Sequence, residues 1–441
     1  MVESALVELR ERGHEILGAV MLGGQEKLPP EGVTAYGDVT VKVGEDAREV
    51  LFSELIRLAP DAVLDLSDEP VLDYRRRFEM AGIALYAGIP YEGADFQLRP
   101  PPQPLLAQRP SIAITGTGKR TGKTAVAGFA ARTLKEEGFR PVIVAMGRGG
   151  PPEPEVLHGD DLELTATDLL ELAAAGKHAA SDYVEDALLG RVATVGCRRC
   201  GGGLAGGVDI SNLAQGVEVA NGLPGDLLIF EGSGSAIPPA KADLSGLILP
   251  ASLPEEYLIG YLGTFRLLLA DFVVVTMCEE PFGSPSKVSS LSSLVHDSWQ
   301  ASREGTPAEK IRLVRTVFRP TPIRSVEGAS VFVATTAPEA AGDVLRGHLE
   351  AVHGCRVVGL SHSLSDRARL KDELRSLGGR ADILLCEIKA AAIDVAARMA
   401  GEQGLEVVFM DNTPVAIDDE DLADVMRWAA RTATERFTGS R

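Results

Sequence analysis

Short apolar runs of strand length recur along the chain and alternate with stretches that place apolar residues at helical spacing. Beyond residue 110 these runs are β-branched and nearly continuous in apolar character, at Ile112–Thr115, Pro141–Met146, Leu227–Glu231 and Phe272–Met277. Strands that are apolar on both faces and separated by helices are typical of a parallel sheet covered on both sides. The pattern therefore predicts an α/β fold with a mostly parallel central sheet.

Residues 111–124 carry the clearest chemical signal, a short strand followed by a Gly-rich turn and a helix. The helix is predicted over Lys123–Glu137, because Gly138 can serve as its C-cap. A Gly-rich turn that opens a helix presents backbone N–H groups to phosphate. Lys123 can reach the β- and γ-phosphates of a nucleotide, and Thr124 can offer its hydroxyl to Mg²⁺. The predicted phosphate loop comprises Gly116, Thr117, Gly118, Thr121, Gly122, Lys123 and Thr124.

The phosphate loop departs from the strict pattern at one position. That pattern requires Gly five positions before Gly122, where this chain has Thr117. Gly116 lies one residue earlier and gives a nine-residue form of the loop. This form resembles the loop of dethiobiotin synthetase and its relatives among the P-loop proteins.

The chain divides into three predicted domains. Residues 1–98 alternate helix-like and strand-like pieces, among them Ile16–Met21, Ala62–Leu66 and Ile83–Ala87, and predict a small N-terminal α/β domain. The Pro-rich segment 99–110 can continue neither a helix nor a central strand, so we interpret it as a linker. The P-loop domain is expected at 111–305 and a smaller C-terminal α/β domain at 306–441. The strands expected in the C-terminal part are Ile311–Phe318, Ser330–Ala334, Arg356–Leu360, Ile383–Glu387 and Glu406–Met410.

Composition and charge exclude several classes of partner. The net charge of −19 makes nonspecific binding to nucleic acid or to an anionic membrane improbable. The longest apolar stretch, Leu267–Met277, is interrupted by Asp271 and is too short to span a bilayer. The N-terminus has no signal-peptide pattern, and the five cysteines suit a reducing compartment. We therefore expect a cytoplasmic protein with no nucleic-acid or membrane partner.

A carboxylate stands where a second magnesium ligand is expected. Glu231 ends an apolar strand and precedes a Gly-rich turn that contains Ser233. Ligands of open parallel sheets bind outside the carboxyl ends of the strands, so Glu231 would face the phosphates. A carboxylate in this place can hold Mg²⁺ directly or through water. Thr124 and Glu231 are the predicted metal ligands.

Two Gly-rich segments with arginines are interpreted as anion-binding loops. The first follows a predicted strand and contains Arg148, Gly149 and Gly150; glycine lets the backbone approach an anion, and arginine offers a planar fork. The second reads Cys197-Arg198-Arg199-Cys200 before three glycines. Its cysteine spacing is also compatible with a zinc half-site or a redox dithiol, but no second ligand pair and no thioredoxin-like context accompany it. We favour an anion clamp.

Further basic residues stand close to the predicted phosphates. Lys119 and Arg120 lie within the phosphate loop and can neutralise charge on a transferred phosphoryl group or on an acceptor phosphate. Lys389 follows a predicted C-terminal strand and can complete a cleft. The sequence does not identify the adenine-binding residues, although the turn Cys278–Pro281 is a reasonable place for the base.

Taken together, these segments resemble the ATP-dependent cyclic 2,3-diphosphoglycerate synthetases. The resembling segments are Gly116–Thr124, Ala145–Glu155, Gly196–Gly206, Glu231–Pro239 and, more weakly, Glu387–Ala392. The clusters around Arg148 and Arg198–Arg199 make the resemblance specific, because generic relatives of dethiobiotin synthetase lack them. The family is expected to begin with a strand and an acidic, His-containing turn, whereas this chain is expected to start directly in the first helix, at Met1–Arg12.

The resemblance implies a reaction and roles for the residues. It implies that 2,3-bisphosphoglycerate is closed into a ring with an internal pyrophosphate while ATP, with Mg²⁺, gives ADP and phosphate. It also favours a homodimer. The residues expected in catalysis are Lys123, Lys119, Arg120 and Glu231. Those expected to contact the substrate are Arg148, Gly149, Gly150, Arg198, Arg199, Ser233 and Lys389.

Two other functions stay open on the sequence. A ligase similar to dethiobiotin synthetase could act on another anionic acid, although its substrate would need less positive charge than the arginines supply. A nucleotide-switch ATPase or GTPase, such as a metallochaperone or a partitioning ATPase, would need a signature lysine near the start of the loop. Lys119 lies one position closer to Lys123 than that lysine does, and the chain has no His-rich tract.

Overall fold

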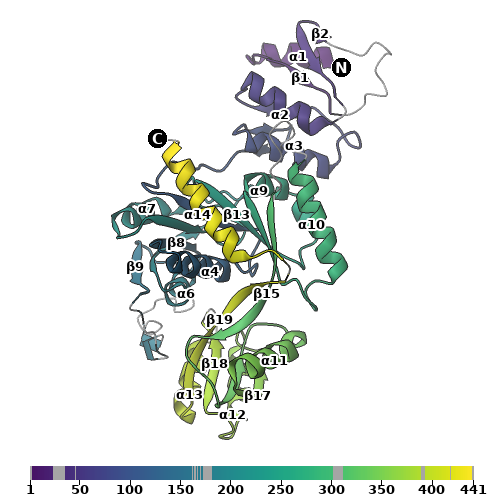
Figure 1. The fold of residues 1–441 in the computed structure, drawn as a ribbon. Helices are drawn as coiled ribbons and strands as arrows, with labels where there is room; N and C mark the ends of the chain where they lie inside the picture. Colours follow the sequence, from purple (N-terminus) through teal and green to yellow (C-terminus); the bar gives the residue numbers. More distant parts are fainter. Residues whose placement is uncertain are drawn as a thin grey trace. The chain divides into compact units, whose positions relative to one another are not determined.

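A computed structural model describes most of the chain and resolves it into two compact units (Figure 1). The described residues are 2–22, 35–44, 46–160, 162, 165, 167–168, 170–171, 181–300, 311–388, 393–417 and 419–439. The first unit comprises Met1–Pro101, Leu253–Ala270 and Ser290–Ile311. The second comprises Pro102–Ser252, Asp271–Ser289 and Arg312–Arg441. The predicted division into three domains, with its boundaries, stays a prediction.

The first unit combines short helices with two small three-stranded sheets, ordered β1-β3-β2 and β4-β5-β6. Its elements are α1 (Val2–Glu11), β1 (Ala19–Val20), β2 (Ala35–Tyr36), β3 (Val39–Lys42), α2 (Ala47–Leu58), β4 (Val63–Leu64), α3 (Tyr74–Tyr86), β5 (Tyr91–Glu92), β6 (Gln97–Leu98), α8 (Glu256–Ile259) and α9 (Gly263–Leu269). The apolar run Ile83–Ala87 forms the end of α3 rather than a strand. Periodicity alone cannot separate a buried helical segment from a strand in so short a run.

The second unit is built on a large sheet of thirteen strands within the described residues, which confirms the predicted α/β class. Its strands are β7 (Ser111–Gly116), β8 (Pro141–Gly147), β9 (Glu155–His158), β10 (Ala193–Cys200), β11 (Ile210–Ser211), β12 (Leu227–Glu231), β13 (Leu244–Pro250), β14 (Phe272–Thr276), β15 (Arg312–Pro322), β16 (Ser330–Ala334), β17 (Arg356–Ser361), β18 (Ile383–Glu387) and β19 (Glu406–Ala416). They follow the order β11-β10-β8-β12-β7-β13-β14-β15-β19-β18-β16-β17, and β9 pairs with β10.

The sheet contains two parallel blocks joined by one antiparallel pair. From β10 to β15 neighbouring strands are parallel, and so are the strands from β19 to β17. β15 and β19 pair antiparallel over Thr316–Pro322 and Met410–Ala416. The carboxyl ends of β8, β10, β12 and β7 therefore lie along one edge of the first block, where ligands of open α/β sheets bind.

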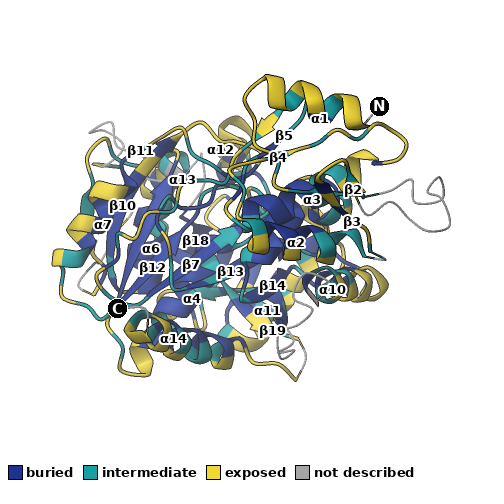
Figure 2. Ribbon diagram, turned by 90° about the horizontal axis from the view of Figure 1, so that it is seen from above, coloured by how far each residue is buried: buried dark blue, intermediate teal, exposed yellow. Residues whose placement is uncertain are grey.

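Helices cover both faces of this sheet, as the continuous apolar strands predict. They are α4 (Lys123–Glu136), α6 (Asp182–Gly190), α7 (Leu213–Gly222), α11 (Gly342–His353), α12 (Arg367–Arg375), α13 (Ile393–Gln403) and α14 (Leu422–Gly439), and α10 (Pro285–Gln300) runs from this unit into the first. Ile112 and Ile114 pack with α4 and α14, whereas Ala113 packs on the side of α7. Figure 2 shows the strands buried and the outer surfaces of α7 and α14 exposed.

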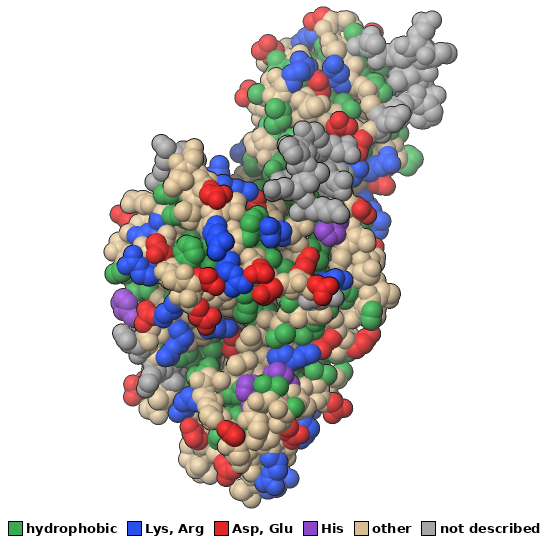
Figure 3. Space-filling view, in the orientation of Figure 1, with side chains coloured by type: hydrophobic (Ala, Val, Ile, Leu, Met, Phe, Trp, Pro, Cys, Tyr) green, Lys and Arg blue, Asp and Glu red, His purple; other side chains and the backbone are tan. Residues whose placement is uncertain are grey.

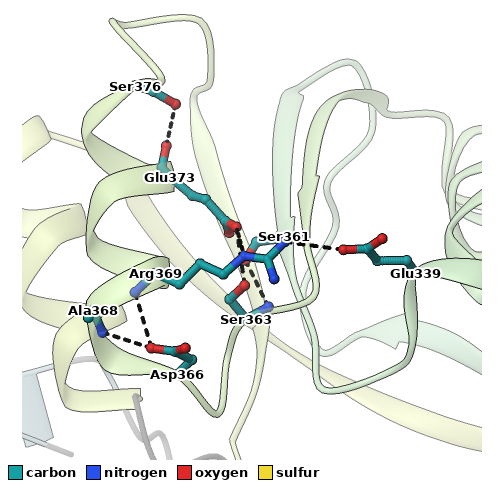
Figure 4. A network of polar contacts seen from close by, with 8 residues as sticks. All are labelled: Glu339, Ser361, Ser363, Asp366, Ala368, Arg369, Glu373 and Ser376. Atoms are coloured by element: carbon teal, nitrogen blue, oxygen red, sulfur yellow. Dashed lines mark hydrogen bonds and ion pairs between the residues drawn. The ribbon is translucent and has the colours of Figure 1, made fainter.

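The second parallel block ends in a polar network of its own (Figure 4). Asp366 caps α12 by accepting from the backbone N–H groups of Ala368 and Arg369. The Arg369 guanidinium pairs with Glu373 and Glu339, and the Ser363 hydroxyl donates to Glu373. These contacts fix the loop after β17 to the start of α12.

Among the described residues, no helix combines the length and the apolar character that crossing a membrane requires.

Candidate functional site

The phosphate loop joins β7 to α4 in the middle of the first parallel block. β7 lies between β12 and β13, and α4 begins at Lys123. Lys123 is only 7% exposed. Its Nζ donates to the carbonyl oxygen of Gly118 at 2.7 Å and lies 3.3 Å from Thr121 Oγ1. The ammonium group is therefore held against the loop that the sequence predicts to bind phosphate.

The backbone of the loop needs glycine at its last position. Gly122 has φ +91°, and a Cβ added there would lie 2.3 Å from Cζ of Phe318 on β15. Arg120, which is exposed, also has a positive φ of 58°. Residues other than glycine adopt this conformation at a cost and often do so at functional sites. The loop conformation thus depends on Gly122 and on the ring of Phe318.

Gly122→Ala is expected to weaken nucleotide binding and to destabilise the protein. Alanine would carry the strain of a positive φ, about 1–2 kcal/mol, and would also collide with Phe318. Gly138→Ala is the matched control, because Gly138 follows the other end of α4 with the same φ of +91° and nothing lies within 4 Å of its added Cβ. Both variants should lose stability in thermal unfolding, but only Gly122→Ala should bind ATP more weakly by calorimetry. Equal ATP affinity in the two variants would contradict this role of Gly122.

The structure brings the two predicted metal ligands together. The hydroxyl of Thr124 donates to Oε1 of Glu231 at 2.6 Å, and both side chains are buried. Glu231 is the last residue of β12, which pairs with β7 directly below the loop. A hydroxyl and a carboxylate at this distance are hard oxygen donors of the kind that bind Mg²⁺.

A third oxygen-bearing side chain, Asp186, was not predicted from the sequence. Asp186 lies on α6 and has no exposed surface. No N–H or hydroxyl group donates to its carboxylate oxygens within the part of the chain that the structure describes, and the side-chain partner of Asp186 is the carboxyl group of Glu231. Burial, followed by the neighbouring Glu231, raises the pKa of Asp186 well above its usual value. Two adjacent buried carboxylates and a hydroxyl fit a divalent cation, because a cation would offset their mutual repulsion.

Two acidic residues that follow the loop after β8 have partners of their own. Glu155 accepts a hydrogen bond from the hydroxyl of Tyr183, and Asp160 pairs with Lys135. Asp161 lies outside the described residues. A sequence signal for Asp186 did exist, since it is an acid among the apolar residues of α6, but an acid on a helix is ordinarily solvated.

Arg199 is the most deeply buried of the predicted substrate-binding arginines, with 5% exposure. Its Nη2 donates to the carbonyl oxygen of Ser233 at 2.7 Å, and its Nη1 donates to that of Gly201 at 2.9 Å. The Nε atom has no hydrogen-bond partner among the described residues. Burial, and then the charge of Arg148, lower the pKa of Arg199. The protein thus buries one cation close to another.

Lys119 extends this group to the phosphate loop. A Cβ added to Gly234 would lie 3.1 Å from Nη2 of Arg199 and 3.8 Å from Cγ of Lys119. Both side chains therefore approach the turn that follows β12, directly after Glu231. We refer to Lys119, Arg148 and Arg199 as the cationic cluster.

On the face drawn in Figure 3, basic and acidic side chains are interspersed over the surface.

Of the two glycines after Arg148, Gly150 lies in close backbone contact with β10. A Cβ on Gly150 would lie 1.9 Å from the carbonyl oxygen of Cys197, so the loop after β8 packs backbone to backbone against β10. Gly149 is partly buried. This close approach holds the loop that carries Arg148 against the strand that carries Arg199.

The structure separates the two arginines of the Cys197–Cys200 segment. This segment lies on β10, where successive side chains point to opposite faces. Arg199 is buried, whereas Arg198 and Cys200 are exposed on the other face. Cys197 is buried against Gly216 of α7, and burial raises its pKa to about 12. Because the two cysteines project to opposite faces, this geometry does not bring their thiols together.

The remaining predicted residues are placed as follows. Lys389 lies outside the described residues. Glu387, just before it, accepts hydrogen bonds from Thr335 and Thr336 at the ends of the second parallel block. The turn Cys278–Pro281 follows β14, whose last residue contacts the phosphate loop: the Thr276 hydroxyl donates to the carbonyl oxygen of Thr121 at 2.8 Å. In that turn Glu279 forms a two-pronged ion pair with Arg319.

Comparisons with known proteins identify the family of the chain. Three family models match: the cyclic 2,3-diphosphoglycerate synthetase N-terminal domain at residues 1–99, its P-loop domain at 111–302 and its C-terminal domain at 322–413. A cyclic 2,3-diphosphoglycerate synthetase of Rubrobacter xylanophilus is 46% identical over 442 residues, covering 100% of this chain and 96% of that protein. The Methanothermus fervidus enzyme of the same name is 42% identical and covers 97% and 93%.

Among solved structures, the hydrogenase maturation factor HypB from Archaeoglobus fulgidus matches with a TM-score of 0.29 and 11% identity, over 47% of this chain and 81% of that one. This likeness is too weak to bear on function. The family models span nearly the whole sequence, and the curated relatives match along almost their full length. The chain therefore belongs to the cyclic 2,3-diphosphoglycerate synthetase family.

Proposed function

We propose that the protein uses ATP and Mg²⁺ to close 2,3-bisphosphoglycerate into cyclic 2,3-diphosphoglycerate, with release of ADP and phosphate. The observation that carries this proposal is the buried guanidinium of Arg199 at the turn after β12, which Lys119 of the phosphate loop also approaches. Burying one cation near another is costly unless an anion joins them. The curated relatives reported above, which are named cyclic 2,3-diphosphoglycerate synthetases, support the same activity.

The charge of the substrate explains why such a cluster is needed. Each phosphate group carries about −1.5 to −2 charges at neutral pH, and the carboxylate of the glycerate adds one more. The protein itself has a net charge of −19. A highly charged anion can bind close to the γ-phosphate of ATP only where positive charge is concentrated. The cationic cluster provides that concentration next to the phosphate loop.

The reaction is proposed to have two phosphoryl-transfer steps. In the first, an oxygen of one substrate phosphate attacks the γ-phosphorus of ATP in line, and the bond from that phosphorus to the bridging oxygen of ADP breaks. In the second, an oxygen of the other substrate phosphate attacks the proximal phosphorus of the new diphosphate, the one that belonged to the substrate, and the bond from that phosphorus to the oxygen of the transferred group breaks. Inorganic phosphate leaves, and the new P–O–P linkage closes the ring. Both nucleophiles are already ionised, so little general-base assistance is required.

The residues of the site have distinct roles in this proposal. Lys123 and the N–H groups of the loop hold the β- and γ-phosphates and stabilise the charge that develops between them. The cationic cluster holds the substrate phosphates and offsets their repulsion from ATP. Thr124 and Glu231, with Asp186 beside them, would hold Mg²⁺, which supplies charge neutralisation at the nucleotide phosphates.

Phosphorus NMR of a mixture of the protein, ATP, Mg²⁺ and 2,3-bisphosphoglycerate tests the proposal directly. We expect the two phosphomonoester signals of the substrate to be replaced by coupled pyrophosphate-like signals, with one ADP and one phosphate formed per ring. A parallel panel of mono-phosphorylated and unphosphorylated acids is scored for ADP formation. ADP formation with an unphosphorylated acid, and none with 2,3-bisphosphoglycerate, would instead support a ligase similar to dethiobiotin synthetase.

A further inference from the structure

We propose that Asn212 positions Arg148 for substrate binding, by holding the loop after β8 against the strand that carries Arg199. Asn212 lies between β11 and α7, outside the segments predicted to bind phosphate or substrate. Its role is a positioning one, because it acts through the loop rather than by touching the substrate. The inference rests on the proposed function, in which Arg148 and Arg199 bind the substrate phosphates.

The side-chain amide of Asn212 forms hydrogen bonds at both of its ends. Asn212 is only 9% exposed. Its Nδ2 atom donates to the carbonyl oxygens of Pro151 at 3.1 Å and Pro152 at 3.0 Å. Its Oδ1 atom accepts from the backbone N–H of Arg198 at 2.7 Å. Because the partners are two acceptors on one side and a donor on the other, the orientation of the amide is fixed.

These contacts begin where the pairing of β8 with β10 stops. The two strands pair in parallel as far as Gly147 and Arg198, and the chain returns to β10 at Glu155 in β9. The two prolines that Asn212 contacts have no backbone N–H and cannot extend the ladder. The amide of Asn212 therefore supplies hydrogen bonds that tie the middle of this loop to the end of β10.

The loop after β8 carries a charge that its neighbour repels. Arg148 follows β8 directly, and Arg199 follows the residue whose N–H binds Asn212. Burial, and then the charge of Arg148, lower the pKa of Arg199, so the two guanidinium groups repel each other when no anion lies between them. A loop held by Asn212 keeps Arg148 in place against this repulsion. A site that is already held in its bound conformation binds its ligand more tightly, because less freedom is lost on binding.

Steady-state kinetics of Asn212→Ala tests the inference. The KM for 2,3-bisphosphoglycerate should rise by about tenfold or more, because a binding group is misplaced, while the KM for ATP stays at the wild-type value. Asn221→Ala is the matched control: Asn221 lies on α7, and its amide also joins two backbone groups, the N–H of Gln108 and the carbonyl oxygen of Leu106. Both variants should lose stability in thermal unfolding, but Asn221→Ala should keep the wild-type KM for both substrates.

A double-mutant cycle with Arg148→Met separates positioning from a general structural effect. If Asn212 acts through Arg148, Asn212→Ala should change the KM for 2,3-bisphosphoglycerate by less than about twofold in the Arg148→Met background. An equal factor in both backgrounds, or no rise in the single variant, overturns the inference. If Asn212→Ala does not fold, Asn212→Asp decides, because aspartate keeps an acceptor for the N–H of Arg198 but has no donor for the two proline carbonyls. A wild-type KM in that variant also overturns the inference.

Hydrogen exchange of the substrate-free protein distinguishes this outcome from a failure of the proposed function. The backbone N–H groups of Arg148, Gly149 and Gly150 should exchange faster in Asn212→Ala than in Asn221→Ala, as measured by mass spectrometry. Faster exchange, together with a wild type that forms no cyclic product, overturns the reaction and leaves the anchoring of the loop intact. Unchanged exchange and unchanged KM, together with a wild type that forms the product, overturn the positioning role and leave the reaction intact.

Discussion

Replacement of Lys123 by methionine is expected to lower ATP turnover by about two to three orders of magnitude, the loss usual when one preorganised donor to a transition-state charge is removed. Lys123 is buried, and its ammonium group already lies within the loop, 2.7 Å from the carbonyl oxygen of Gly118. Methionine keeps an unbranched apolar stem of similar length but removes the charge. The variant should therefore fold normally and lose the interaction with the γ-phosphate.

Lys135→Met is the matched control for Lys123→Met. Lys135 lies on the same helix, α4, but is partly exposed and pairs with Asp160. Release of ADP in the presence of 2,3-bisphosphoglycerate should fall only in Lys123→Met, while the melting temperatures of the two variants stay close to the wild type. Equal turnover in both variants would show that Lys123 is not part of the phosphoryl-transfer machinery.

The local part of the site was predictable because it is contiguous in sequence. The strand expected at Ile112–Thr115 is β7, and the helix expected from Lys123 is α4, which ends one residue earlier than predicted. Strand, turn and helix each depend on residues close together in the chain. The positive φ of Gly122 is a property of this local pattern as well, although its contact with Phe318 is not.

Pairing between distant strands could not be derived from the sequence. β10 and β13 were not expected as strands, because Gly196 and Gly246 interrupt their apolar character. In the structure both glycines are required, since an added Cβ would collide with Tyr183 and Phe272, respectively. The antiparallel pair of β15 and β19, which joins the two parallel blocks, depends on residues almost a hundred positions apart.

Because β10 was not predicted as a strand, Arg198 and Arg199 were expected to act on the same side of the chain. Arg198 and Arg199 were interpreted together as one clamp, which suits a flexible Gly-rich loop. On a strand, adjacent side chains must point to opposite faces, and only Arg199 reaches the turn after β12. Asp186 was missed for a related reason: its sequence neighbours predict a helix but not the approach of Glu231 from another element.

Replacement of Arg199 by methionine is expected to lower substrate-dependent ATP turnover by about a hundredfold or more, chiefly through a higher KM for 2,3-bisphosphoglycerate. A buried guanidinium that contacts an anion contributes several times more than an exposed one, because water does not screen it. Arg198→Met should cause a much smaller loss, since Arg198 is exposed on the opposite face of β10. Steady-state kinetics with varied substrate at saturating ATP measures both effects.

The stability of the same variant distinguishes a functional arginine from a structural one. Burial and the charge of Arg148 lower the pKa of Arg199, so the folded protein without substrate disfavours the charged form of this side chain. Methionine removes that unfavourable charge, although it also leaves the carbonyl oxygens of Ser233 and Gly201 without their donor. We expect these two effects on the free energy of unfolding to nearly cancel. The melting temperature should then stay close to that of the wild type, although substrate-dependent ATP turnover falls strongly. A much lower melting temperature of Arg199→Met would assign Arg199 a structural role. An unchanged KM for 2,3-bisphosphoglycerate in Arg199→Met, together with a raised KM in Arg198→Met, would place the substrate phosphates away from Arg199.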